Sequence, residues 1–150
     1  MADANRSGAL LDAVRDEIEA VHRFIAAWFR GEMSQTAACF EAGFAGRVDA
    51  DLVNIQPAGL ALSREALLSS IEKGFGTNPR FEIEIRDVRI PFVCERSGLL
   101  LATYVEVQRG ALQTTPPENV RISTVLLQRD IASGSFTWLH IHETAIGPAA

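Results

Sequence analysis

The stretch Phe136-Thr137-Trp138-Leu139-His140-Ile141-His142-Glu143-Thr144 decides the fold of this 150-residue chain. Its aromatic and β-branched residues are typical of a β-strand, and it carries two of the three histidines in the chain. The segments before it predict helices and strands that pack around this last strand. No complete catalytic signature accompanies them, so the sequence indicates a fold more directly than an activity.

Composition predicts a globular chain of one domain, residues 1–150, with a core from about residue 9 to residue 147. The net charge is −5, and the 14 lysines and arginines are scattered, so we expect no nucleic-acid partner. No apolar run approaches the ~18 residues that span a bilayer, so we expect no membrane partner. The N-terminus lacks the apolar segment of a signal peptide, which favours a cytoplasmic location.

Helices are expected in the first half of the chain. Apolar residues recur at steps of three and four across residues 9–30, which predicts an amphipathic helix. Residues 35–44 predict a second, short helix, and Ser63 is a suitable N-cap for a third. Between them, residues 51–56 alternate as a strand does, and a Pro-Ala-Gly turn follows.

Long strands are expected in the second half, at residues 80–92, 99–109, 119–129 and 135–145. Helices followed by a meander of strands predict an α+β fold. The N-terminal helices would pack on one face of a strongly curved, mainly antiparallel sheet and enclose a pocket with it. A tail after Ile146 is expected to be loose.

The other face of the sheet is expected to meet a second copy of the chain. Residues 99–109 are apolar on both strand faces for most of their length, and an exposed apolar face calls for a partner. We therefore expect a homodimer or a larger ring, with Val105 and Val107 in the interface. Charge introduced at either valine should split the dimer.

The two histidines of the last strand allow two interpretations. His140 and His142 share a strand face with Trp138 and Thr144 if side chains alternate regularly. Such a pair could bind a metal or act as a base, but a metal needs further ligands, and His22 has no partner at a suitable spacing. We favour a place for His140, His142 and Thr144 in the subunit interface, and we expect no metal and no cofactor.

Glu106, Glu143 and Tyr104 are the candidates for polar side chains that face the pocket. Glu143 lies on the face opposite the histidines, with Leu139 and Ile141, and Glu106 shares a face with Tyr104. Two carboxylates and a phenol that converge in an apolar pocket would have raised carboxylate pKa values and could perform acid–base chemistry. Alternatively, Glu106 pairs with an arginine at the strand surface, and Tyr104 only packs in the core.

The order of these elements resembles the nuclear-transport-factor-2-like superfamily of cone-shaped α+β domains. The similarity is carried by His140-Ile141-His142-Glu143-Thr144, by Tyr104-Val105-Glu106-Val107-Gln108 and by Arg129-Asp130, and it spans roughly residues 11–147. Within the superfamily, the chain is most similar to the association domain of calcium/calmodulin-dependent protein kinase II, which ends in His-x-His-x-Ser, and to its stand-alone bacterial relatives. No kinase segment accompanies it here.

The resemblance implies a conical pocket between helices and sheet, and dimers built through the outer face of the sheet. It also implies arginines in the pocket, whereas Glu106, Thr124 and Glu143 stand at the corresponding positions here. A cationic or neutral ligand, or a role in proton transfer, therefore suits the site better than an anion. Tyr104, and Trp28 where the cone opens, complete the expected ligand-binding set.

Three functions remain open from the sequence. The first is a self-associating domain that binds an unidentified small molecule. The second is a small enzyme, because the superfamily includes ketosteroid isomerase and SnoaL-like polyketide cyclases. That resemblance implies a carboxylate base, here Glu106 or Glu143, and a donor, here Tyr104. The third is recruitment of a partner through an edge of the sheet.

Overall fold

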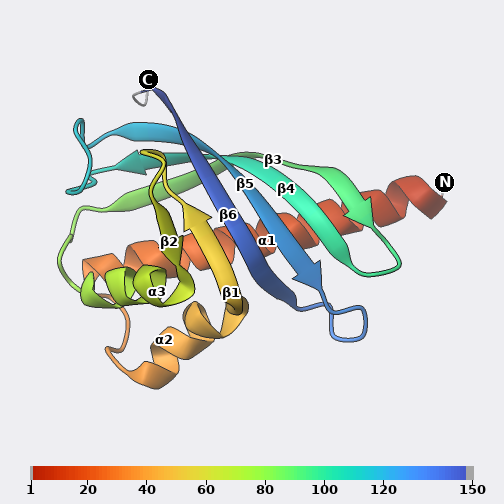
Figure 1. The fold of residues 1–150 in the computed structure, drawn as a ribbon, viewed down its shortest axis with the longest axis horizontal. Coiled ribbons are helices and arrows are strands. Elements are labelled where there is room, and N and C mark those ends of the chain that lie inside the picture. The colour runs from red at the N-terminus through yellow and green to blue at the C-terminus, as the bar shows by residue number, and fades with distance from the viewer. Residues whose placement is uncertain (1, 148–150) are drawn as a thin grey trace.

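A long first helix and a six-stranded sheet form the body of the molecule (Figure 1). The computed structural model describes residues 2–147. The helices are α1 (Ala2–Arg30), α2 (Ala37–Gly43) and α3 (Arg64–Lys73), with a 3-10 turn η1 (Ala45–Arg47). The strands are β1 (Val48–Ile55), β2 (Ala61–Ser63), β3 (Glu82–Cys94), β4 (Leu99–Arg109), β5 (Asn119–Arg129) and β6 (Phe136–Gly147). The expected loose tail falls mostly on residues 148–150, outside the described part of the chain.

Helix α1 covers the inner face of the sheet with the apolar stripe that the sequence predicts. Val14, Ile18 and Val21 are almost completely buried, at spacings of three and four residues. The helix begins well before residue 9, and its first turns extend past the end of the β3–β4 hairpin (Figure 1). No proline interrupts residues 2–8, so nothing in that segment stops the helix early.

The sheet has the strand order β2-β1-β6-β5-β4-β3. Strands β3 to β6 form an antiparallel meander, and β1 pairs antiparallel with β2 but parallel with β6. The α+β class and the mainly antiparallel sheet are thereby confirmed. The short edge strand β2 follows directly on the predicted turn and was not expected from the sequence.

A β-bulge in β6 reverses part of the predicted pattern. Leu126 pairs with His140 and Leu127 pairs with Trp138, so Leu139 is an extra residue without a partner in β5. Trp138 therefore faces the core, where 1% of its surface is exposed, while His140 faces outward. The expectation that Trp138 and His140 share a face is wrong, because it assumed unbroken alternation.

Strand β3 forms one free edge of the sheet, and its pairing with β4 is irregular. The register shifts between Arg86 and Arg89 and again between Arg89 and Phe92. Asp87 has a positive φ of 53°, and Pro91 has no N–H to donate. The backbone along this edge is thus interrupted at several points.

The core lies between the three helices and the inner face of the sheet. Its sheet side is formed by alternate residues of β4 and β5: Leu100, Ala102, Val125 and Leu127. Along residues 2–147, no helix is both long enough and apolar enough to cross a lipid bilayer.

Candidate functional site

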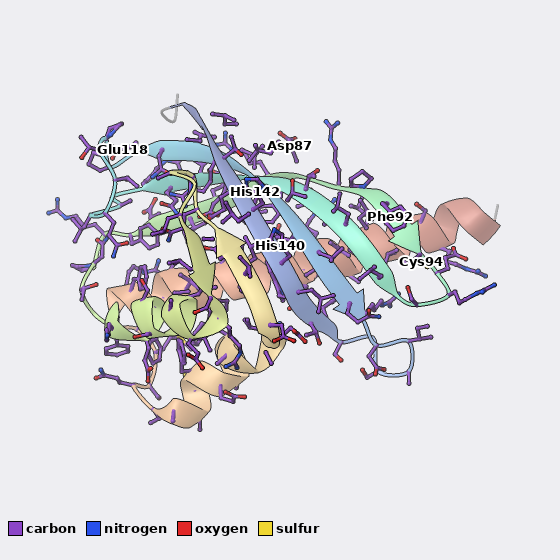
Figure 2. The ribbon with its side chains drawn as sticks, in the orientation of Figure 1. Asp87, Phe92, Cys94, Glu118, His140 and His142 are labelled. Atoms are coloured by element: carbon purple, nitrogen blue, oxygen red, sulfur yellow. The ribbon has the colours of Figure 1, made fainter. Side chains whose placement is uncertain are left out.

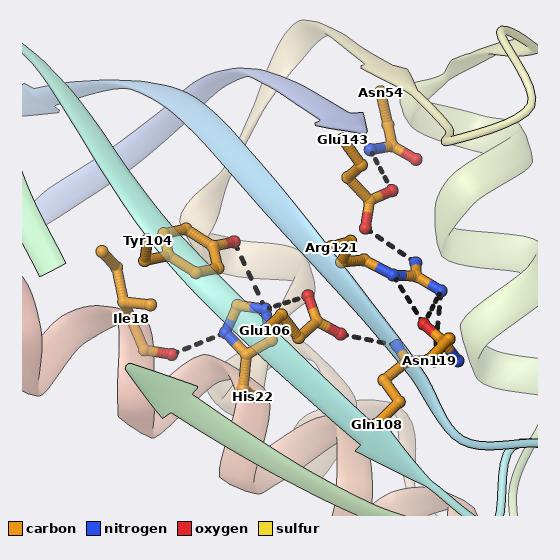
Figure 3. A network of polar contacts seen from close by, with 9 residues as sticks. All are labelled: Ile18, His22, Asn54, Tyr104, Glu106, Gln108, Asn119, Arg121 and Glu143. Carbon is orange, nitrogen blue, oxygen red and sulfur yellow. Dashed lines mark hydrogen bonds and ion pairs between the residues drawn. The ribbon is translucent and has the colours of Figure 1, made fainter. Parts of the chain in front are cut away.

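Three polar side chains from α1 and β4 meet inside the molecule (Figure 3). Nε2 of His22 lies 3.3 Å from the Tyr104 hydroxyl oxygen and 3.4 Å from Oε2 of Glu106. On the other side of the ring, Nδ1 lies 2.7 Å from the main-chain oxygen of Ile18. All three side chains belong to buried residues, with 8% of His22, 2% of Tyr104 and 3% of Glu106 exposed.

His22 reaches this place because it belongs to the apolar stripe of α1. It follows Ile18 by one helical turn and precedes Ile25, so it faces the sheet as they do. The sequence suggests His22 only as a metal ligand without partners and does not predict it as a site residue. Its position within the apolar stripe was a signal that could have indicated it.

The surroundings of His22 and Glu106 favour a charged pair. Burial alone would lower the pKa of His22, but the charge of Glu106 and the hydrogen bond to it raise that pKa above 6.5. Burial alone would raise the pKa of Glu106, but His22, Arg121 and Gln108 hold it below 4.5. The expected rise in carboxylate pKa is therefore wrong for Glu106, because it left out the buried histidine.

Tyr104 keeps its proton at every ordinary pH. Burial and the charges of Glu106 and Glu143 raise the pKa of Tyr104 well above 10. The phenol is thus a hydrogen-bond donor inside the molecule.

A second polar network lies beside the first and is joined to it (Figure 3). Arg121 on β5 donates from Nη1 to Oε1 of Glu143, at 3.0 Å, and from Nη2 to Oε1 of Gln108, at 3.1 Å. Glu143 also accepts a hydrogen bond of 3.3 Å from the amide of Asn54 on β1. Gln108 in turn donates to Oε1 of Glu106 at 2.5 Å, so a continuous chain of polar contacts crosses the inner face of the sheet.

A partly open cavity of about 160 Å³, here called the interior cavity, lies against these side chains on the inner face of the sheet. The polar part of its wall includes His22, Tyr104, Glu106, Gln108, Arg121 and Glu143. The apolar part includes Val21, Ile25, Phe44, Leu67, Ile71 and Ile141. A larger cavity of about 520 Å³ lies between the β1–β2 turn, the β4–β5 loop and the end of β6, and Arg121 lines both cavities.

Tyr104, Glu106 and Glu143 therefore line one cavity, as their alternation along the strands predicts. Thr124 does not join them. Tyr104 pairs directly with Ser123 on β5, so Ser123 shares the inner face and Thr124 lies on the outer one. The expected inward position of Thr124 is wrong by one residue, and Arg121 and Ser123 are the inward residues of β5.

Trp28 is packed in an aromatic cluster of the core. Its ring lies 5.0 Å from that of Phe40 and 4.8 Å from that of Phe75, and its Nε1 donates to the main-chain oxygen of Glu72 at 3.2 Å. Within the described part of the chain, Trp28 is not among the residues that line the interior cavity. It belongs to the core wall rather than to the candidate ligand site.

The residues expected in a subunit interface all lie on the outer face of the sheet, and all but Val107 have exposed surface there. His140, His142 and Thr144 point away from the core, and Figure 2 shows both histidines on β6. Val105 is partly exposed on the same face. Only 2% of Val107 is exposed in the single chain, so Val107 has almost no surface to offer a partner.

Comparison with solved structures decides the family. An NTF-2-like protein of unknown function from Pseudomonas aeruginosa is 30% identical to this chain and superposes on it with a TM-score of 0.78. The alignment covers 90% of this chain and 99% of the Pseudomonas protein. The chain belongs to the NTF2-like family. The superfamily predicted from the order of the elements and the short motifs is thereby confirmed.

Other solved structures share the NTF2-like fold at lower identity. The CaMKII hub of S. rosetta is 14% identical, with a TM-score of 0.63 over 89% of this chain and 95% of the hub. A candidate dehydratase of the NTF2-like family from Streptomyces avermitilis is 15% identical, with a TM-score of 0.65 over 93% of this chain and 98% of its own. No family model matches the chain. No curated protein matches it either.

The site of this NTF2-like domain can form hydrogen bonds and exchange protons. Among residues 6–147, whose side chains the structure describes, no three His, Cys, Asp or Glu side chains gather as metal ligands do. Nε2 of His22 lies between a carboxylate and a phenol, the raised pKa of His22 favours its protonated form, and all three groups line the cavity. The chemistry open to this arrangement is hydrogen bonding to a ligand and transfer of a proton to or from it.

Proposed function

We propose that the protein is a self-associating domain that binds a small molecule in its interior cavity. The observation that carries this proposal is the polar cluster of His22, Tyr104 and Glu106, which shares the wall of one cavity with apolar residues of α1, α3 and β6. Burying charged groups costs free energy that apolar residues of similar volume would avoid. Polar groups that converge on a cavity are the usual mark of a binding site.

Self-association is supported by the charge pattern of the outer face. The outward residues in the centre of β4, β5 and β6 carry no fixed charge: Leu99, Leu101, Thr103, Val105, Ile122, Thr124, Leu126, His140, His142 and Thr144. A face of this kind can meet its own copy across a two-fold axis without opposing like charges. The shared fold with a CaMKII hub agrees with a homodimer or a larger ring.

A ligand screen on the full chain tests binding. We would measure the melting temperature with steroid-like, small aromatic and cationic compounds, for the wild type, Glu106→Gln and the surface control Glu84→Gln. A bound compound should raise the melting temperature of the wild type and the control, and raise that of Glu106→Gln less. An equal rise in Glu106→Gln would remove this carboxylate from the site. No rise with any compound would contradict the proposal.

A second candidate function is proton transfer by a small enzyme. It is favoured by the approach of the Tyr104 hydroxyl and the Glu106 carboxylate to the same nitrogen of His22. Ionised Glu106 would accept a proton from the ligand, and Tyr104 would donate a hydrogen bond to the charge that develops. The shared fold with a candidate dehydratase agrees with this alternative.

Deuterium exchange separates the enzyme from the binding domain. Cyclohexanone in deuterated buffer would be followed by NMR for exchange at the carbons next to its carbonyl. The enzyme hypothesis expects exchange above the buffer rate with the wild type and Glu84→Gln, and its loss with Glu106→Gln. Exchange at the buffer rate with the wild type would contradict the enzyme hypothesis and leave small-molecule binding as the proposed function.

We also propose a cytoplasmic location. Cys39 and Cys94 are both free thiols, which agrees with a reducing compartment.

A further inference from the structure

The hydroxyl of Ser123 lies next to the Tyr104 hydroxyl at the cavity wall, and it is a fully buried polar group without a hydrogen-bond partner among the described residues. Ser123 is completely buried, and its Oγ makes no hydrogen bond there. It lies on the inner face of β5, paired with Tyr104 on one side and Glu143 on the other, and both neighbours line the cavity. A buried hydroxyl without a partner is costly, so its position points to a group supplied from outside the chain.

The hydroxyl of Tyr104 is also able to serve a ligand. When Nε2 of His22 carries a proton, it cannot accept the Tyr104 proton, and the phenol O–H is left to donate elsewhere. Tyr104 and Ser123 are cross-strand neighbours on one face of the sheet. Two adjacent hydroxyl groups can both donate a hydrogen bond to one oxygen of a ligand.

The ionisable groups of the cavity wall are already paired. His22 lies against Glu106 and Arg121 lies against Glu143, so the two positive and two negative charges balance. Arg121 also donates to Gln108 and Asn119, which occupies most of its N–H groups. A charged ligand would enter without a counter-charge, which is strongly unfavourable in a buried site.

The volume of the cavity limits the size of the ligand. It measures about 160 Å³, below the ~300–1,000 Å³ that is usual for drug-sized molecules. It is close to the ~150 Å³ of an apolar protein cavity that takes up benzene. A single six-membered ring fits this space, and a steroid would extend beyond it.

We infer that the interior cavity takes a compact uncharged molecule, about the size of benzene, whose hydroxyl or carbonyl oxygen bonds to Tyr104 and Ser123. This inference rests on the proposed binding function and defines the class of its ligand. Phenol has the required oxygen, benzene lacks it, and benzoate and benzylamine add a negative and a positive charge to the same ring.

Binding of these four probes to the full chain would be measured by titration calorimetry and NMR, for the wild type, Ser123→Ala and Tyr104→Phe. Each variant should lower the ratio of phenol to benzene affinity by roughly threefold to tenfold, because each removes one hydroxyl partner. Benzene affinity should stay within about twofold of the wild type. The free energy of hydration of phenol and of benzene does not depend on the protein variant, so it cancels when the affinity ratios of two variants are compared. Benzoate and benzylamine should bind at least about tenfold more weakly than phenol.

Ser123→Ala should also melt at or above the wild-type temperature, because it removes an unpaired buried hydroxyl. Tyr104→Phe keeps the ring and gives an independent test should Ser123→Ala fold poorly.

If benzene and phenol bind but the ratio of their affinities stays unchanged in both variants, the proposed oxygen site is wrong and the binding cavity stands. If benzoate or benzylamine binds as well as phenol, the uncharged class is wrong. If none of the four probes binds, the inference falls. The proposed binding function falls with it only if the broader ligand screen is also empty.

Discussion

His22 fixes the geometry of the interior polar cluster. Its Nδ1 donates to the main-chain oxygen of Ile18, four residues earlier in the same helix, so the ring cannot turn without losing that bond. Nε2 is thereby held toward Tyr104 and Glu106. A rigid helix thus aims a proton-bearing nitrogen at the cavity, which is the kind of support that a binding or catalytic group needs.

Loss of the Glu106 charge should destabilise the protein strongly. Glu106→Gln leaves the His22 imidazolium buried without its counter-charge, and breaking a buried pair costs about 3–5 kcal/mol. Urea unfolding would measure the loss against Glu84→Gln, whose carboxylate pairs with Arg86 and Arg109 at the surface. A loss no larger than that of Glu84→Gln would show that the buried pair is not ionised.

Stability should depend on pH in the window set by this pair. The pKa of His22 is raised above 6.5, so its contribution is complete below 6.5 and disappears as the pH rises through the folded value. The pKa of Glu106 is lowered below 4.5, so its contribution is complete above 4.5 and disappears as the pH falls through the folded value. Arg121, Glu143 and protonated Tyr104 are the other ionisable groups around the pair.

The difference in unfolding free energy between the wild type and Glu106→Gln should therefore be largest between pH 4.5 and pH 6.5. Denaturation curves from about pH 3 to about pH 9 would show it. A difference that stays constant across this range would contradict a charged pair.

Among the elements, β6 shows what periodicity can and cannot predict. Alternation placed Glu143 on the inner face and His140 and His142 on the outer face, as the structure has them. Alternation failed at Trp138, because the bulge at Leu139 arises from the pairing of β6 with β5 and cannot be recognised in the sequence of β6 alone. The bounds of β4 and β5 could be predicted to the residue, because these two strands pair with each other without a bulge.

The same limit applies to the candidate site. Tyr104 and Glu106 lie two residues apart on one strand, so alternation alone brought them together. His22 joins them from a helix 82 residues away from Tyr104 in the chain, and Asn54 reaches Glu143 across 89 residues. Contacts of that range depend on how layers pack, which no local pattern encodes. Helix α1 offered a hint only because His22 interrupts its apolar stripe.

Helix α3 begins where its sequence predicts, and its cap can be tested. The Ser63 side chain accepts a hydrogen bond from the main-chain N–H of Ala66. Ser63→Ala should lower the unfolding free energy by about 1 kcal/mol, because an N–H of the first turn loses its acceptor. Ser69→Ala, within the same helix, is the matched control and should leave stability equal or slightly higher. Equal values for both variants in urea unfolding would rule out a role for the cap.

On the scale of the whole molecule, charge substitutions can distinguish residues of the outer sheet face that hold copies together from residues that hold the fold together. Val105→Asp and Ile122→Asp add charge to partly exposed positions of this face, and they should split the assembly without unfolding the chain. Analytical ultracentrifugation would measure the mass of the assembly, and circular dichroism would show whether the chain is folded. Leu60→Asp, at an exposed position in the β1–β2 turn, is the matched control and should keep the wild-type mass.

Val107→Asp should behave differently from its neighbour. Val107 is buried within one chain, so an aspartate there should unfold the protein rather than only separate its copies. The burial of Val107 therefore changes the outcome expected for this valine from loss of the dimer to loss of the fold. A wild-type mass for both Val105→Asp and Ile122→Asp would place the interface elsewhere.

The irregular β3 edge has a consequence for how copies can grow into larger bodies. Continuous polymers of the amyloid kind elongate when an incoming strand zips onto an uninterrupted row of main-chain donors and acceptors. The shifted register on both sides of Arg89, the turned backbone at Asp87 and the missing donor of Pro91 break that row. Open-ended fibre growth along this side of the sheet is thereby discouraged.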